Sequence, residues 1–239
     1  MEIKLNDENL PFDIHATKNP VFDLLPGITV FAGCNGHGKS TTIKQIARFM
    51  QENNHPYLYY DATMHDINTV TETNMLTYCL QASEGERVYA IFGEFVAKIR
   101  KERERCKWDS RPMILLIDGI DSGLSIDVII EIRNFLCFIL HEIIEYGVLP
   151  YICIATNSYE LCNEPDYFNA GIFEYNKEMR NLYLAKYFRC CDACNFEYLK
   201  FSSYTEYHKY VTKTSKMKSE RIAKFFKDAD NKKKGNVEE

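Results

Sequence analysis

The chain has 239 residues, of which 46% are hydrophobic and 26% charged, as in ordinary globular proteins and unlike disordered or fibrous ones. No stretch approaches the ~18 to 20 continuous apolar residues of a membrane helix, and the polar start over 1–9 does not resemble a signal peptide. We therefore expect a cytoplasmic protein with no membrane partner. Nine cysteines, an odd number scattered through predicted strands and helices, favour reduced thiols over a disulfide framework.

The net charge of −5 is unevenly distributed along the chain. Residues 200–239 carry 11 Lys and Arg against 6 Asp and Glu, a local charge of +5, which leaves about −10 for residues 1–199. Such a basic C-terminal region could bind DNA or an acidic protein surface. The alternative is a solvated helix that ends in frayed lysines, and this is the more common meaning of such a charge run.

Hydrophobic periodicity and turn residues divide the chain into alternating strands and helices. In chain order we expect strands over 3–5 and 28–32, a helix ending near 53, a strand over 57–60, helices over 75–80 and 84–107, a strand over 113–117, a helix over 126–146, a strand over 151–155, a hairpin over 171–175 and 182–188, and a helix over 203–227. This order predicts a three-layer α/β/α domain with a mostly parallel central sheet over 1–188. A small basic appendage is expected over 189–239.

A phosphate-binding pattern lies between the strand over 28–32 and the helix that follows it. The pattern G-x-x-x-x-G-K-[ST] is matched by Gly33-Cys34-Asn35-Gly36-His37-Gly38-Lys39-Ser40. In such a P-loop the glycines let backbone N–H groups point at phosphate oxygens, and the positive end of the helix adds to that field. Lys39 would reach the β- and γ-phosphates and Ser40 would ligate Mg²⁺. A chance Gly-rich turn is the alternative.

A carboxylate that could complete the magnesium site follows the apolar strand over 113–117. Asp118 is placed like a Walker B carboxylate, which holds Mg²⁺ through water on the far side of the nucleotide from Ser40. The alternative is an ordinary Asp at a strand end that caps a helix or forms a turn.

Four segments, in order over about 26–160, resemble motifs of the ABC-type P-loop ATPases. The P-loop, ending in Ser40-Thr41, resembles N-G-x-G-K-S-T, and Asp118-Gly119-Ile120-Asp121-Ser122-Gly123-Leu124-Ser125 resembles the family's D-E-P-x-S-G-L-D. Ala82-Ser83-Glu84-Gly85-Glu86-Arg87 is similar to the signature L-S-G-G-[QE]-R, and Ala155-Thr156-Asn157-Ser158 falls where the family has T-H-S. The short segment between Ser40 and Ser83 excludes the helical subdomain of transporters and the long coiled coil of DNA-repair members. The chain thus resembles a minimal AAA-family ATP-binding protein of phages and mobile elements.

The resemblance implies ATP and Mg²⁺ as ligands, and a homodimer in which each ATP lies between the P-loop of one copy and the signature segment of the other. The implied nucleotide-binding residues are Asn35, Gly36, His37, Gly38, Lys39, Ser40, Thr41, Ser83 and Gly85, and the implied Mg²⁺ ligands are Ser40 and Asp118. For Ser83 the alternative is that it only caps a surface helix, with Glu86 completing a capping box.

The departures from the family pattern predict weak hydrolysis. Gly119 stands where the family has the Glu that positions water, and Asn157 replaces a switch His, so it can hydrogen-bond a phosphate but cannot carry a proton. Asp121 is the nearest carboxylate that could substitute, and with Asp118 and Asn157 it completes the candidate catalytic set. We expect an ATP-dependent switch acting on DNA or a protein partner. An ATP-sensing module without turnover and a P-loop phosphotransferase remain alternatives.

Weaker patterns concern the C-terminal part. Cys190-Cys191-Asp192-Ala193-Cys194 contains C-x-x-C, with His208 downstream, but a structural zinc site usually needs a second pair of ligands. Free thiols at a hairpin tip are the favoured interpretation. His37 is expected to face solvent because its place in the P-loop is variable. Tyrosines and lysines around Tyr207 predict either an amphipathic helix packed on the body or a nucleic-acid contact.

Overall fold

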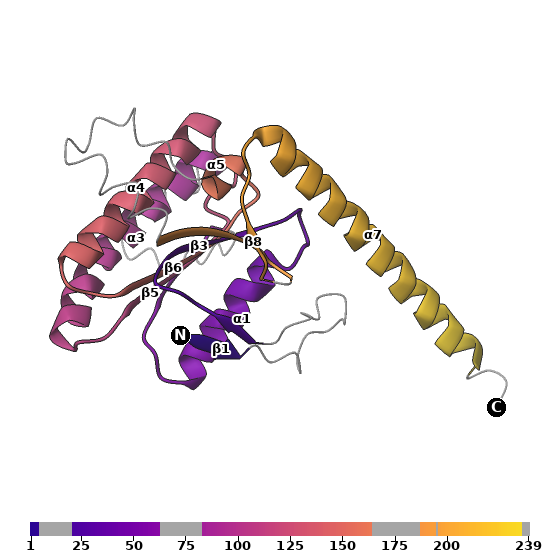
Figure 1. The fold of residues 1–239 in the computed structure, drawn as a ribbon, viewed down its shortest axis with the longest axis horizontal. Coiled ribbons are helices and arrows are strands. Elements are labelled where there is room, and N and C mark those ends of the chain that lie inside the picture. Colours follow the sequence, from indigo (N-terminus) through magenta and orange to yellow (C-terminus); the bar gives the residue numbers. More distant parts are fainter. Residues whose placement is uncertain (5–20, 63–82, 164–186, 195, 236–239) are drawn as a thin grey trace.

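The protein is described from a computed structural model that covers residues 1–4, 21–62, 83–163, 187–194 and 196–235. Its centre is a six-stranded sheet in the order β4-β5-β6-β3-β7-β8 (Figure 1). The strands are β3 (Gly27–Ala32), β4 (Leu58–Asp61), β5 (Met113–Asp118), β6 (Pro150–Ala155), β7 (Phe188–Asp192) and β8 (Tyr198–Leu199). All neighbours are parallel except β7 and β8, which pair antiparallel. A separate antiparallel pair joins β1 (Glu2–Lys4) to β2 (Val21–Asp23).

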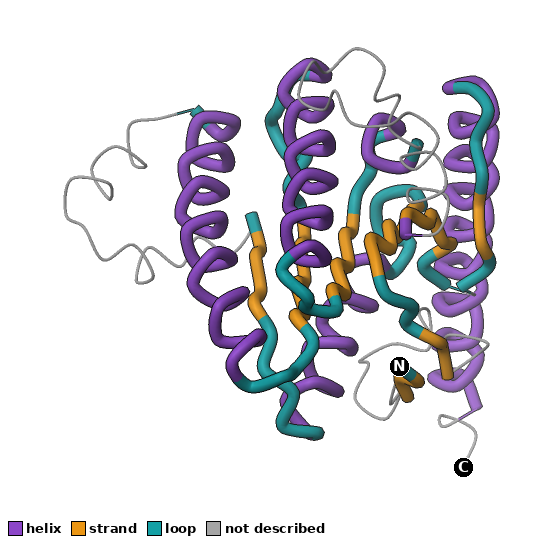
Figure 2. Tube along the Cα trace, turned by 60° about the vertical axis from the view of Figure 1, so that its left-hand side comes forward, coloured by secondary structure: helices purple, strands orange, loops and turns teal. Residues whose placement is uncertain are grey.

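Helices cover both faces of the sheet, as Figure 2 shows. They are α1 (Lys39–Glu52), α3 (Glu84–Trp108), α4 (Ile126–Glu145), α5 (Tyr159–Cys162) and α7 (Tyr204–Gly235). Helix α1 packs on β5 and β6 from one side, and α3 and α4 pack on β4, β5, β6 and β3. The fold is therefore α/β with a mostly parallel sheet between helical layers. In the described ranges, no helix has the length and apolar character needed to cross a membrane.

Strand β5 lies between the two helical layers, and all six of its residues are buried. Side chains alternate between the faces of a strand. Ile114 and Leu116 pack in one cluster with Ile43 of α1, whereas Leu115 and Ile117 pack in the other, with residues of α3 and α4. This double burial explains the continuous apolar run in the sequence, which is typical of central parallel strands.

Most predicted elements are confirmed, with small shifts in their ends. The strands over 28–32, 57–60, 113–117 and 151–155 correspond to β3, β4, β5 and β6, and the four long helices correspond to α1, α3, α4 and α7. The strand expected over 3–5 corresponds to β1 (Glu2–Lys4), and it pairs with β2, which the sequence pattern did not predict. The helix expected over 75–80 and most of the hairpin expected over 171–188 lie outside the described residues.

Strands β7 and β8 form an antiparallel hairpin, and the expectation of free thiols at a hairpin tip is confirmed for Cys194 but wrong for the position of Cys190 and Cys191. Both are buried in β7, which pairs parallel with β3, while Cys194 lies in the following turn. The sheet consequently continues past residue 188, where the sequence analysis places the domain boundary. All cysteines in the described ranges are free thiols.

Candidate phosphate-binding site

The P-loop joins the carboxyl end of β3 to the first turn of α1. Three of its glycines, Gly33, Gly36 and Gly38, have positive φ angles of 146°, 72° and 93°. A Cβ on Gly33 would lie 2.3 Å from the His37 ring, so the tight turn requires glycine there. Gly38 is the N-cap of α1 and offers no side-chain hydrogen bond, and the first turn contains no acidic residue. The positive end of α1 is therefore neither capped nor neutralised by its own side chains.

Lys39 points back into this loop. Its side chain is buried, and Nζ donates hydrogen bonds to the carbonyl oxygens of Gly33, at 3.0 Å, and Cys34, at 2.8 Å. Burial lowers the pKa of the Lys39 ammonium, while the carboxylates of Asp121 and Asp118 are among the groups that oppose this shift. A buried cation whose described hydrogen-bond acceptors are neutral carbonyls gains energy from an anion placed beside it.

Ser40 and Asp118 come together across the sheet. The Ser40 Oγ donates a hydrogen bond to Asp118 Oδ1 at 3.0 Å. Ser40 lies in α1, which follows β3, and Asp118 ends β5, and these two strands are not neighbours because β6 lies between them. Burial raises the pKa of the Asp118 carboxyl, the Ser40 hydrogen bond lowers it, and the Asp61 charge adds to the increase. The result is a hydroxyl and a buried carboxylate at the mouth of the P-loop.

Asp61 is a site residue that the sequence analysis missed. It ends β4 and lies opposite Asp118 in the parallel register, so two carboxylates meet at this edge of the sheet. Its place directly after a predicted strand was the signal that could have identified it, since ligands bind at the carboxyl ends of such strands.

The candidate catalytic residues Asp121 and Asn157 are joined by a hydrogen bond that holds the backbone of the loop after β6. Asp121 Oδ2 accepts hydrogen bonds from the Thr156 hydroxyl, at 2.7 Å, and from the Asn157 backbone N–H, at 2.8 Å. Asn157 itself is exposed at the end of β6. Gly119 follows Asp118 with a φ of 70° and provides no side chain. Asp121 therefore fixes the loop after β6, and that role occupies one of its carboxylate oxygens.

Ser83 and Gly85 lie in the first turn of α3 and its cap. The capping box is present: Ser83 Oγ accepts from the Glu86 N–H at 3.4 Å, and the Glu86 carboxylate accepts from the Ser83 N–H at 2.8 Å. Among the described contacts, no hydrogen bond or ion pair joins Ser83 or Gly85 to residues 33–41 of the same chain. The positive end of α3, unlike that of α1, is occupied by its own carboxylate.

One face of α7 covers the P-loop, which sequence patterns did not reveal. Thr214 Oγ1 accepts from the Cys34 N–H at 3.4 Å, and Lys218 Nζ donates to the Asn35 carbonyl at 2.9 Å. Two turns earlier, the Tyr207 hydroxyl donates to the Asn157 carbonyl and the Tyr210 hydroxyl donates to Asp192 Oδ2 at 2.6 Å. The alternative that this helix packs on the body is thus confirmed, and it packs on the loops that follow β3, β6 and β7.

His37 is buried, so the expectation that it faces solvent is wrong. It is 5% exposed because β7 and α7 close over this part of the loop. Its Nε2 lies 3.1 Å from Asp192 Oδ2, and the Cys194 thiol donates to the His37 carbonyl at 3.0 Å.

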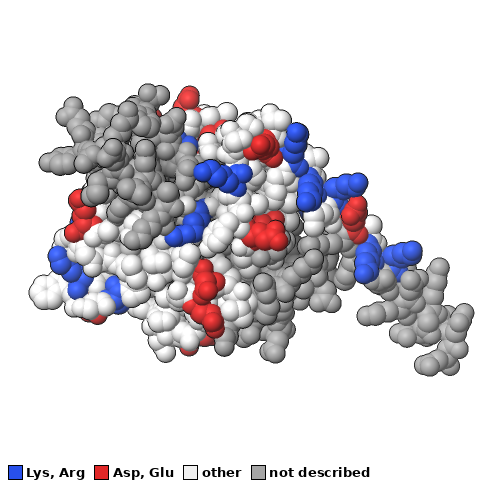
Figure 3. All heavy atoms as spheres, in the orientation of Figure 1, with Lys and Arg blue, Asp and Glu red and all other residues white. Residues whose placement is uncertain are grey.

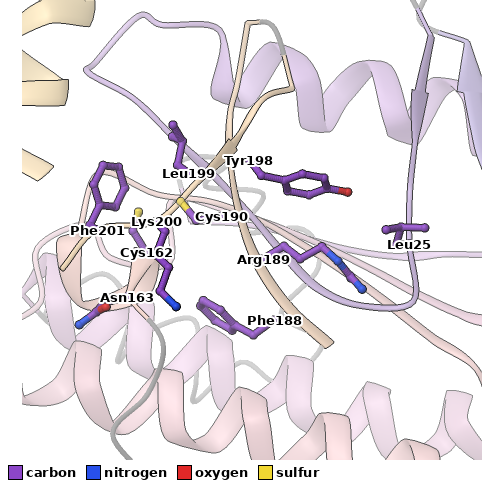
Figure 4. A pocket seen from close by; sticks show the side chains of 10 residues that line it. All are labelled: Leu25, Cys162, Asn163, Phe188, Arg189, Cys190, Tyr198, Leu199, Lys200 and Phe201. Atoms are coloured by element: carbon purple, nitrogen blue, oxygen red, sulfur yellow. The ribbon is translucent and has the colours of Figure 1, made fainter. Parts of the chain in front are cut away.

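A cavity of about 290 Å³ lies elsewhere, beside β7 and β8 (Figure 4). Its lining includes Cys162, Phe188, Arg189 and Phe201, and no P-loop residue. It is therefore not the phosphate-binding site.

Comparisons with protein-family models, with curated proteins and with solved structures found no match for this chain. The similarity to ABC-type ATPases rests on the four sequence motifs. Of these, the P-loop and Asp118 lie together in the structure, whereas the segment around Ser83 makes no described polar contact with them.

Proposed function

We propose that this chain binds ATP with Mg²⁺ at the P-loop, as a slow ABC-type ATPase that works as a switch. The observation that carries the proposal is the 3.0 Å hydrogen bond between Ser40 Oγ and Asp118 Oδ1 beside the uncapped start of α1. A hydroxyl and a carboxylate are oxygen ligands of the kind that Mg²⁺ prefers, and a helix start with free N–H groups favours phosphate.

The residues present fit these ligands. Lys39 would exchange the carbonyls of Gly33 and Cys34 for phosphate oxygens, which are stronger partners for an ammonium group. Ser40 and Asp118 would hold Mg²⁺, which neutralises phosphate charge when bound. Asp61 adds negative charge on the metal side of the site.

Slow turnover is proposed because the position after Asp118, where the family has the Glu that positions water, is Gly119, and the nearest carboxylate that could substitute, Asp121, is engaged in holding the loop after β6. Gly119 has no side chain, and Asp121 Oδ2 already accepts two hydrogen bonds from the loop after β6. This observation also favours a second candidate, an ATP-sensing module without turnover. Measurement of ADP formation in a single turnover distinguishes the two. Gly119→Glu is a poor test because a φ of 70° strains any other residue.

The proposed active form is a homodimer in which Ser83 and Gly85 of one copy meet the phosphates held by the other. The capping box makes this contact conditional, because the Glu86 carboxylate must leave the start of α3 before a phosphate can approach. ATP should therefore promote dimers that Ser83→Arg prevents, as measured by light scattering. A monomer that releases ADP only with a small acceptor would favour a phosphotransferase instead.

The basic part of α7 is the proposed contact for a DNA or protein partner. Figure 3 shows Lys and Arg side chains along this helix, and Lys213, Lys216 and Lys224 are exposed. Because Thr214 and Lys218 bind the P-loop backbone, a change in the loop on nucleotide binding would reach the same helix.

The test is calorimetric titration with a non-hydrolysable ATP analogue in the presence and absence of Mg²⁺. Lys39→Ala should weaken binding by at least about 100-fold, since the loss of a buried charge-assisted contact costs about 3 kcal/mol. Asp118→Asn should abolish the effect of Mg²⁺. Lys101→Ala, at an exposed position of α3, is the matched control and should bind normally. Unchanged affinity of Lys39→Ala would refute the proposed site.

A further inference from the structure

A second cluster of chemically reactive side chains joins the P-loop to the end of β7. His37 belongs to the loop, whereas Asp192 ends β7 and Cys194 lies two residues further on. One ligand atom from each, an imidazole nitrogen, a carboxylate oxygen and a sulfur, can be chosen so that all lie within 4.8 Å of one another. We propose that these three residues bind a transition-metal ion, with Zn²⁺ as the best fit.

The distances suit a tetrahedral ion. Zn²⁺ binds nitrogen and oxygen at about 2.0–2.2 Å and sulfur at about 2.3 Å, so its ligand atoms lie about 3.3–3.7 Å apart. His37 Nε2 and Asp192 Oδ2 are 3.1 Å apart, close to that separation. The Cys194 sulfur lies no more than 4.8 Å from the other two ligand atoms, and rotation of the side chains would have to bring it to the separation that the ion requires.

The surroundings orient the proposed ligands. Asp192 Oδ2 accepts a hydrogen bond from the Tyr210 hydroxyl at 2.6 Å, and Oδ1 accepts one from the Cys194 N–H at 2.8 Å. Metal-binding carboxylates are commonly held by such outer partners. His37 and Asp192 are buried, while Cys194 is partly exposed and gives an ion a way in.

The ligand types select the metal. Imidazole and thiolate prefer Zn²⁺ and similar ions, whereas Mg²⁺ and Ca²⁺ prefer oxygen ligands only. Three protein ligands leave the fourth position for water. These residues differ from the Mg²⁺ ligands proposed for the nucleotide site, and the proposal requires no nucleotide.

Binding would exchange protons for the ion. The thiol of Cys194 must lose its proton, and so must the imidazole nitrogen that now contacts Asp192. The ion would then link the P-loop to the end of β7 through His37. Without the ion, His37 and Asp192 form a hydrogen-bonded pair, and the Cys194 thiol donates to the His37 carbonyl.

The experiment uses the full chain stripped of metal by EDTA and titrated with Co²⁺ and then Zn²⁺, without nucleotide. We expect one ion per chain, a sulfur-to-cobalt charge-transfer band in the near ultraviolet, and loss of that band as Zn²⁺ displaces Co²⁺. His37→Gln and Cys194→Ser should lower affinity by more than the ~10- to 100-fold typical of losing an outer partner.

Two control variants keep the ligands and remove similar groups elsewhere. Cys106→Ser changes a buried thiol at the end of α3, and His208→Gln changes an exposed imidazole on α7. Both should bind Co²⁺ as the unmodified chain does. Absence of the charge-transfer band in the unmodified chain would overturn the proposal, even if a ligand variant fails to fold. Equal affinity of folded Cys194→Ser, or loss of binding in His208→Gln, would overturn it as well.

Discussion

Tyr210→Phe tests whether α7 is held on the candidate phosphate-binding site by the contacts described above. The substitution keeps the ring and removes only the hydroxyl, which donates to Asp192 Oδ2 at 2.6 Å. Burial, together with the Asp192 carboxylate, raises the pKa of Tyr210 far above its ordinary value, so the hydroxyl remains a donor at all usual pH values. A hydrogen bond to a charged group contributes about 1.5–3 kcal/mol, so the free energy of unfolding should fall by about 2 kcal/mol.

The assay is urea unfolding followed by circular dichroism, in EDTA so that bound metal does not contribute. Tyr204→Phe is the matched control, because Tyr204 lies on the same helix and is 60% exposed. It should change the free energy of unfolding by less than about 0.5 kcal/mol. Equal effects of the two substitutions, or no effect of Tyr210→Phe, would refute the assigned contact.

Three further predictions address the backbone, a buried thiol and the loop after β6. Gly27→Ala should lower the free energy of unfolding in urea by more than about 3 kcal/mol, because the new Cβ would lie 2.1 Å from the Tyr187 carbonyl oxygen. Its control is Gly93→Ala on α3, where the new Cβ meets open space. That substitution should raise the free energy of unfolding by about 0.5–1 kcal/mol. Burial and a neighbouring thiol raise the pKa of Cys191 from 9.0 to about 12. Above pH 9 the thiol ionises in the unfolded chain before it does so in the folded one, so the free energy of unfolding should fall as pH rises. The same dependence of the unfolding free energy on pH in Cys191→Ala would contradict this. Asp121→Ala should weaken stability by about 1–3 kcal/mol through loss of two hydrogen bonds, and a variant as stable as the unmodified chain would show that this carboxylate does not hold the loop.

The parts of the fold that depend on local patterns could be predicted from the sequence. Strand β5 is buried on both faces, so its apolar run is continuous, and α1 packs by one face, so its apolar residues recur with helical spacing. The P-loop is also local, because its turn needs glycines at fixed places. These local features predict the candidate phosphate-binding loop and Asp118, and the structure brings the two together.

The remaining features depend on contacts between distant segments. His37 is buried only because β7 becomes the neighbour of β3 and α7 closes above it, more than 150 residues further along the chain. The residues next to His37 in the sequence therefore do not predict its burial. Asp61 was missed for a related reason: its importance follows from the parallel register that places it opposite Asp118.

The shape of α7 has a mechanical consequence. The helix has 32 residues and so is about 48 Å long, and the hydrogen bonds that it makes to loops among the described residues lie within the stretch that ends at Lys218. The remaining length, about 25 Å, extends away from the body in Figure 1. If the helix rotates as a rigid rod by about 10° at its attached end, the far end moves by about 4 Å, because the displacement is the angle in radians times the length. A sub-ångström change at the P-loop could thereby become a displacement large enough to align or separate a partner's binding groups.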